Sequence, residues 1–211
     1  MTDPLTTLFC DIGGVIIENP WVSMSKKLGL KYRVERRIVY SELMRLGGEL
    51  DRNEITLYAF NQQLSESLKK PISYAYFERL LLGPSLRKIP VVWNAVLKLK
   101  NSASLSIIAL SNMSERPWES LQRKYEIQSL FDDTVLSFRY GVTKPDLRIF
   151  ELALEKAKSS PEECLFLDDT GENIRAARSL GLLTHLAGHQ KETAEFLLSL
   201  QKRSHKPTIT R

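Results

Sequence analysis

The chain has 211 residues, of which 43% are hydrophobic and 26% are charged. This composition is typical of a folded globular protein and argues against a disordered or fibrous class. No apolar run approaches the roughly 18 residues of a membrane span. The first residues also lack the basic start and apolar stretch of a secretory signal. We therefore expect a cytoplasmic protein that does not enter the membrane.

The net charge of +5 raises the question of a nucleic-acid partner. The basic excess lies at the chain end, however, because no acidic residue follows Glu195. We expect 204–211 to be a solvated basic tail, and we do not expect nucleic-acid binding. Cys10 and Cys164 lie in apolar runs without a nearby Cys or His. We expect buried, reduced thiols rather than zinc ligands.

The first part of the chain predicts one buried strand followed by helices. An apolar run from Leu8 ends at Asp11, and Gly13 and Gly14 follow at once. Pro20 and its neighbours are expected to break the pattern. Apolar spacing then predicts helices over 23–28, 34–46, 55–68 and 74–82, with 51–54 supplying the start of the third. No strand pattern interrupts this helical region.

From residue 90 onward, strand and helix patterns alternate. Strands are predicted over 105–110, 134–138, 164–167 and 182–187, and helices over 91–100, 114–125, 146–158, 172–180 and 192–202. This alternation predicts an α/β fold with a Rossmann-like parallel sheet covered on both faces. We expect a core of 1–17 and 86–203, with 18–85 inserted after the first strand as an all-helical cap.

Polar residues follow four of the predicted strands. Asp11 ends the first, Ser111 and Asn112 the second, Lys144 comes after the third, and Asp168-Asp169 end the fourth. The carboxyl ends of parallel strands meet at one edge of the sheet, where ligands bind. One Asp can attack phosphorus, and paired carboxylates suit Mg²⁺. A hydroxyl and an ammonium group can bind the phosphate oxygens.

These motifs resemble, in this order, the four motifs of the haloacid dehalogenase superfamily. The resemblance covers the whole core and is most specific in 141–149 and 165–180. The helical insertion resembles the C1-type cap of that superfamily. The Asp-x-Gly start with Ser-Asn and Lys-Pro is similar to the branch that includes bacterial α-D-glucose-1-phosphate phosphatase and the N-terminal phosphatase domain of soluble epoxide hydrolase.

The resemblance implies a role for each matching residue. Asp11 would be the nucleophile that forms an aspartyl-phosphate, and Ser111 and Lys144 would be catalytic phosphate binders. Asn112 would belong to the substrate-binding set or, like Asn173, orient its neighbours. Mg²⁺ would be held by four groups: Asp11, the backbone carbonyl of Gly13, Asp169, and Asp168 either directly or through a neighbour.

One position departs from the family pattern. Gly13 stands where a second Asp usually protonates the leaving group. A positioned general acid typically contributes about 10²- to 10⁴-fold in rate. Three explanations follow: a leaving group that needs little help, a cap residue or water that supplies the proton, or a chain that binds phosphate or Mg²⁺ without turnover.

The favoured hypothesis is a slow Mg²⁺-dependent phosphatase that acts on a small phosphorylated metabolite, with a sugar 1-phosphate as one candidate. The first alternative is an inactive interaction module that binds a partner through the cap, whose Arg33, Arg36 and Arg37 form a basic stretch. The second is a dehalogenase, against which the Asp168-Asp169 pair argues. We expect a monomer or a weak homodimer.

Overall fold

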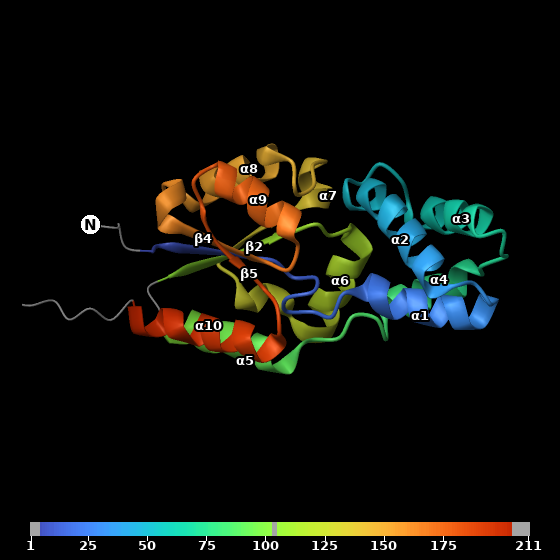
Figure 1. Cartoon of the computed structure of the whole chain (residues 1–211), viewed down its shortest axis with the longest axis horizontal. Coiled ribbons are helices and arrows are strands. Elements are labelled where there is room, and N and C mark those ends of the chain that lie inside the picture. Colours follow the sequence, from blue (N-terminus) through green and yellow to red (C-terminus); the bar gives the residue numbers. More distant parts are fainter. Residues whose placement is uncertain (1–4, 103–104, 204–211) are drawn as a thin grey trace, which may run out of the picture.

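The computed structural model describes residues 5–102 and 105–203. It has a core built on a sheet and a helical cap at one edge of that sheet (Figure 1). The predicted basic tail, 204–211, lies outside the described residues. None of the helices in the described ranges is long and apolar enough to cross a membrane.

The core sheet has five parallel strands in the order β3-β2-β1-β4-β5. The strands are β1 Thr7–Cys10, β2 Ser106–Ser111, β3 Asp133–Leu136, β4 Cys164–Asp168 and β5 Leu183–Leu186. Cys10 at the end of β1 pairs with Ala109 and Leu167 on its two neighbours. The strands therefore end together, and the prediction of a parallel α/β sheet is confirmed.

Helices cover both faces of the sheet because successive strand residues point to opposite sides. Leu8 and Cys10 pack in the cluster on the α5 and α10 side, and Phe9 packs in the cluster on the α8 and α9 side (Figure 1). The helices of the core are α5 Pro90–Ser102, α6 Glu115–Tyr125, α7 Ser137–Tyr140, α8 Leu147–Ala157, α9 Gly171–Ser179 and α10 Gln190–Arg203. Burial on both faces explains why the strands read as continuous apolar runs.

The cap consists of α1 Pro20–Tyr32, α2 Arg36–Asp51, α3 Leu57–Ser67 and α4 Tyr74–Leu82. Its buried side chains form their own cluster, distinct from the two clusters of the core. Phe60 stacks between Trp21 and Phe77, with ring centroids 5.6 and 5.4 Å away. The cap is thus held together by packing within itself.

Polar contacts attach the cap to the core at the carboxyl edge of the sheet. The Ser137 hydroxyl at the start of α7 donates to the main-chain carbonyl of Asp51 at 2.7 Å. The Ser120 hydroxyl of α6 donates to the carbonyl of Leu82 at 2.6 Å. These contacts hold the ends of α2 and α4 over the strand ends.

Three element boundaries differ from the sequence predictions. Pro20 does not break the pattern but starts α1, because its missing N–H is unneeded in the first turn and Asn19 caps the helix at 3.0 Å from the Trp21 amide. Helix α2 continues beyond residue 46 to Asp51 instead of a new helix starting there. Strand β3 ends at Leu136, and Phe138, predicted as strand, lies in α7.

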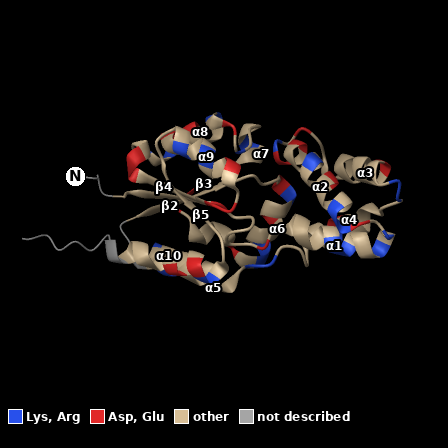
Figure 2. Ribbon diagram, viewed as in Figure 1, with Lys and Arg blue, Asp and Glu red and all other residues tan. Residues whose placement is uncertain are grey.

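Basic residues lie on the outer surfaces of the cap, on α1 and α2 (Figure 2). Arg33, Arg36 and Arg37 are all exposed, and Arg37 pairs with Glu35 at 2.7 Å. An exposed helix face of this kind is well solvated and needs no partner to be stable.

Candidate active site

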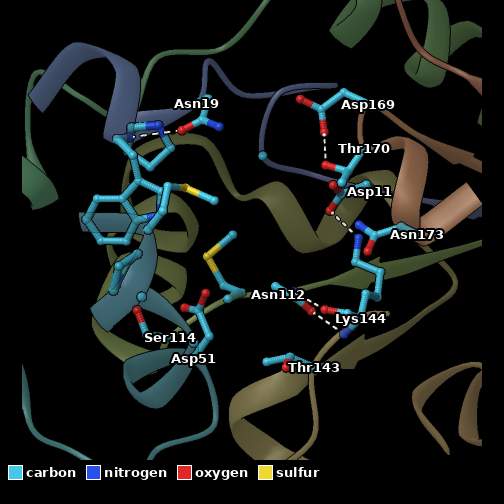
Figure 3. Close-up of a pocket in the computed structure, with 18 of the residues that line it drawn as sticks. Asp11, Asn19, Asp51, Asn112, Ser114, Thr143, Lys144, Asp169, Thr170 and Asn173 are labelled. Carbon is cyan, nitrogen blue, oxygen red and sulfur yellow. Dashed lines mark hydrogen bonds and ion pairs between the residues drawn. The ribbon is translucent and has the colours of Figure 1, made fainter. Parts of the chain in front are cut away.

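A cavity of about 310 Å³ lies between the cap and the carboxyl ends of the core strands. Asp11, Lys144 and Asp169 line its core side, and Figure 3 shows them converging from three separate segments. This juxtaposition follows from the parallel sheet, which brings strand ends that are distant in sequence to one edge.

Lys144 is the centre of the charged group. Its side chain is buried, and Nζ lies 3.0 Å from Asp11 Oδ1 and 2.6 Å from Asp168 Oδ2. It also donates to the main-chain carbonyl of Leu110 at 2.9 Å. All three N–H groups of the ammonium are therefore directed at oxygen atoms. Burial lowers the pKa of Lys144, but Asp11 and Asp168 outweigh burial and raise the pKa, so this lysine stays charged.

The two adjacent carboxylates Asp168 and Asp169 differ in their surroundings. Asp168 is fully buried and accepts hydrogen bonds from the Thr170 amide at 2.7 Å and from the Asn173 side chain at 3.0 and 3.1 Å. Its oxygens are thus engaged by internal donors, and it orients Lys144. Asp169 is exposed and lines the cavity, where its oxygens are accessible to a ligand.

The adjacent residues Ser111 and Asn112 have different surroundings. The Asn112 amide holds the backbone of Lys144, donating to its carbonyl at 2.9 Å and accepting from its N–H at 2.8 Å. Ser111 is buried at the end of β2, with its hydroxyl 3.5 Å from the Asn112 carbonyl. Asn112 lines the cavity, whereas Ser111 is not among the lining residues.

The acidic residues form a group that fits a divalent cation. Ligand oxygens of Asp11, Asp168 and Asp169 lie within 4.8 Å of one another. Three carboxylates and the single ammonium of Lys144 leave an excess of two negative charges when all are ionised. An all-oxygen, net-anionic donor set is the kind that Mg²⁺ prefers. Asp169 is the most accessible of the three carboxylates.

The surroundings of Asp11 disfavour the ionised form of its carboxyl. Burial raises the pKa of its carboxyl above the ordinary range; Lys144 opposes this shift, and Asp168 and Asp169 add to it. The Ile12 amide donates to Asp11 Oδ1 at 2.7 Å and fixes the side chain. A cation placed among these carboxylates would favour the ionised form, which is the nucleophilic one.

The two glycines after Asp11 have different constraints. Gly14 has φ +82°, and a Cβ built there would lie 2.0 Å from Asp169 Oδ2. A Cβ at Gly13 would meet no atom within 4 Å. Gly14 is therefore required by the close approach of Asp169, whereas Gly13 leaves open space near Asp11.

Sequence reasoning missed an acidic residue of the cavity wall. Asp51, at the end of α2, lines the cavity from the cap side together with Trp21 and Met44. The sequence analysis places Asp51 in the 51–54 segment that starts the third helix, because these residues have helix-start chemistry, whereas it is the last residue of α2. No turn residue stands between Gly48 and Asp51, and this absence could have indicated that the helix continues to Asp51.

The family model for haloacid dehalogenase-like hydrolases matches residues 6–181. The chain therefore belongs to the haloacid dehalogenase-like hydrolase family.

Individual relatives agree with this assignment. The chain is 26% identical over 185 residues to the D-ribitol-5-phosphate phosphatase of Bacteroides thetaiotaomicron, covering 82% of this chain and 87% of the relative. It is 27% identical over 169 residues to mouse bifunctional epoxide hydrolase 2, covering 79% of this chain. The chain spans only 29% of that protein and 14% to 20% of other mammalian relatives that it matches.

A solved structure shares the fold. A HAD family enzyme of Bacteroides thetaiotaomicron, in complex with magnesium and inorganic phosphate, matches with a TM-score of 0.68 at 23% identity. The match covers 87% of this chain and 94% of that enzyme. The two chains therefore share a fold.

Replacing Lys144 by Met should destabilise the protein strongly. Removing one partner of a buried ion pair typically costs about 3 to 5 kcal/mol, because the other charge remains buried without compensation. Urea unfolding at pH 7 without divalent cations measures this change. As a control, Lys156→Met removes a partly exposed pair with Asp133 and should cost at most about 1 kcal/mol. Equal losses in the two variants would contradict the central role of Lys144.

Gly14→Ala should weaken the site, whereas Gly13→Ala should be tolerated. Alanine in the left-handed region costs about 1 to 2 kcal/mol, and the Gly14 variant must also displace Asp169. Thermal unfolding with and without Mg²⁺ should show a lower midpoint and a smaller Mg²⁺-dependent increase for Gly14→Ala. Equal behaviour of both variants would show that the contact with Asp169 is unimportant.

Proposed function

We propose that the protein is a Mg²⁺-dependent phosphatase that acts on a small phosphate monoester through an aspartyl-phosphate at Asp11. The observation that carries the proposal is the convergence of Asp11, Lys144 and Asp169 on one cavity. Membership of a hydrolase family and similarity to a named sugar-phosphate phosphatase support it. The magnesium and phosphate bound by an enzyme of the same fold are also consistent with it.

In this proposal each residue has a distinct task. Asp11 attacks phosphorus, and Lys144 orients the nucleophile and places its positive charge beside the phosphoryl group. Ser111 would contribute a hydroxyl to the phosphate, and Asn112 would keep Lys144 in place. The Mg²⁺ ligands would be Asp11, the Gly13 carbonyl and Asp169, with Asp168 positioning Lys144. Bound Mg²⁺ supplies positive charge that offsets the negative charge of the phosphoryl group.

The cavity wall indicates the class of leaving group. Among the described residues that line it, Lys144 is the one basic side chain, and it is already committed to carboxylates. The cap side is largely apolar, with Trp21, Met44 and Leu81. A leaving group that carries a second phosphate or a carboxylate would meet no counter-charge there. We therefore propose a monophosphate of a small neutral alcohol or sugar, and a sugar 1-phosphate fits this class.

The cap is proposed to act as one unit, residues 18–85, that closes the cavity over the substrate. Its separate buried cluster and its attachment through the ends of α2 and α4 support this division. A dehalogenase is disfavoured because the Asp168-Asp169 pair adds negative charge that a halide leaving group does not require. An interaction module without turnover remains the alternative that the following assay tests.

Purified protein should release phosphate from p-nitrophenyl phosphate only when Mg²⁺ is present. Chelation should abolish release, because the uncompensated carboxylates around Asp11 repel the substrate. Asp11→Asn should lower the rate by at least about 10³-fold, since it removes the nucleophile.

Glu49→Gln is the matched control for a lost carboxylate, because Glu49 lies on α2 away from the cavity lining. It should retain the wild-type rate. Release that is equal in wild-type protein and Asp11→Asn, or that persists in chelator, would exclude the proposed phosphatase and favour the interaction module.

Substrates with a second anionic group should be poor. We expect kcat/KM for glucose 1,6-bisphosphate to be at least about tenfold below that for glucose 1-phosphate, equivalent to about 1.4 kcal/mol. Met44→Lys should reduce the difference in kcat/KM between the two substrates, because it adds a positive charge at the cavity wall. Equal kcat/KM values for both substrates in the wild-type protein would contradict the inferred leaving-group class.

A further inference from the structure

The phosphatase reaction proposed above, on which this inference rests, releases an alkoxide that must gain a proton. Gly13 supplies no side chain for this purpose, and the space beside it is open. A proton donor must therefore come from elsewhere on the cavity wall or from water. Loss of a positioned acid typically lowers the rate by about 10²- to 10⁴-fold, so the source matters.

The described residues that line the cavity leave few candidates. Their titratable side chains are Asp11, Asp51, Lys144 and Asp169, and no His, Cys, Tyr or Glu is among them. Asp11 is the nucleophile, and Asp169 belongs to the cation-binding group. Lys144 directs its N–H groups at two carboxylates and a main-chain carbonyl. Among these four side chains, Asp51 is the one acid to which the proposed mechanism assigns no other role.

The fold holds Asp51 where a donor is needed. It is the last residue of α2, and Figure 3 shows it beside Ser114, across the cavity from Asp11 and Lys144. The Ser137 hydroxyl fixes its main-chain carbonyl at 2.7 Å and also accepts from the Met113 amide at 3.0 Å. The cap residue is thus anchored to Ser137 at the start of α7 and, through that hydroxyl, to Met113 after β2.

We propose that Asp51, a cap residue facing the nucleophile across the cavity, is the catalytic acid that protonates the leaving group in place of a side chain at Gly13.

The surroundings of Asp51 keep it partly protonated near neutrality. Burial raises its pKa to about 7, and the nearby Asp11 adds to the increase. Lys144, Arg52 and the Ser114 hydroxyl act in the opposite direction. Because this pKa is raised, the acid form is present below about pH 7 and is lost as the pH rises above it. A general acid is most effective when its pKa lies near the working pH.

The proposed reaction has two chemical steps. An oxygen of Asp11 bonds to phosphorus while the bond from phosphorus to the leaving oxygen breaks. That oxygen takes the proton of Asp51 and departs as an alcohol, leaving Asp51 ionised. Water then attacks the phosphorus of the aspartyl-phosphate and gives a proton to Asp51. Asp11 leaves as a carboxylate, inorganic phosphate is released, and Asp51 regains its acid form.

The test compares substrates whose leaving groups differ in their need for a proton. With glycerol phosphate, Asp51→Asn should lower kcat by about 10²- to 10⁴-fold. With p-nitrophenyl phosphate, whose leaving group departs unaided, the loss should be below about tenfold. The wild-type rate on glycerol phosphate should also fall above about pH 7, and this limb should be absent in Asp51→Asn. Glu49→Gln should change neither the rates nor the profile.

A second variant separates catalysis from folding. Gly13→Asp in the Asp51→Asn background should restore turnover of glycerol phosphate more than that of p-nitrophenyl phosphate, since the space beside Gly13 admits a side chain. Equal losses on both substrates in Asp51→Asn, or an unchanged alkaline limb, would overturn the role of Asp51 while leaving the phosphatase intact. A wild-type protein inactive on p-nitrophenyl phosphate would instead overturn the proposed function itself.

Discussion

The site depends on the ammonium group of Lys144, which joins two buried carboxylates that would otherwise repel each other. Its contacts at 3.0 Å with Asp11 and 2.6 Å with Asp168 connect β1, β4 and the loop before α8. Such a buried charge is tolerated only when its hydrogen bonds are satisfied, and here each N–H has an acceptor. Asn112 secures the backbone of Lys144 and Asn173 secures Asp168. Asp11 is thereby held in place.

The single cation does not balance the carboxylates of the cluster. Asp169 faces the cavity without a basic partner among its described contacts, and the cluster retains an excess of negative charge. An excess of carboxylate oxygens at one place is a donor set that suits a divalent cation. The absence of a side chain at Gly14 also lets Asp169 lie close to the segment that follows β1, because a Cβ at Gly14 would overlap the Asp169 carboxylate.

Most of the core could be predicted from the sequence because its signals are local. Apolar runs mark the buried strands, and the residues after each strand, such as Asp11 and Asp168, converge by the geometry of any parallel sheet. Asn112 and Asn173 were predicted to orient their neighbours, and their hydrogen bonds have that form. The family assignment follows from the same motifs and is confirmed by the family model.

The cap side of the site could not be predicted, for physical reasons that involve tertiary packing. Each glycine in a helix costs up to about 1 kcal/mol relative to alanine, so Gly47-Gly48 suggests a helix end. In the structure Gly47 lies against Trp21, and α2 continues to Asp51 because α1 packs on it. The position of Asp51 opposite Asp11 depends further on its attachment to Ser137, a contact 86 residues apart in sequence.

The central claim is that Asp11 becomes covalently phosphorylated. The most direct measurement is to quench the protein with acid during turnover of p-nitrophenyl phosphate, reduce any acyl phosphate with borohydride, and sequence the peptides by mass spectrometry. We expect conversion of Asp11 alone to homoserine, dependent on both substrate and Mg²⁺. Continued phosphate release with residue 11 unmodified, or modification at another carboxylate, would contradict it.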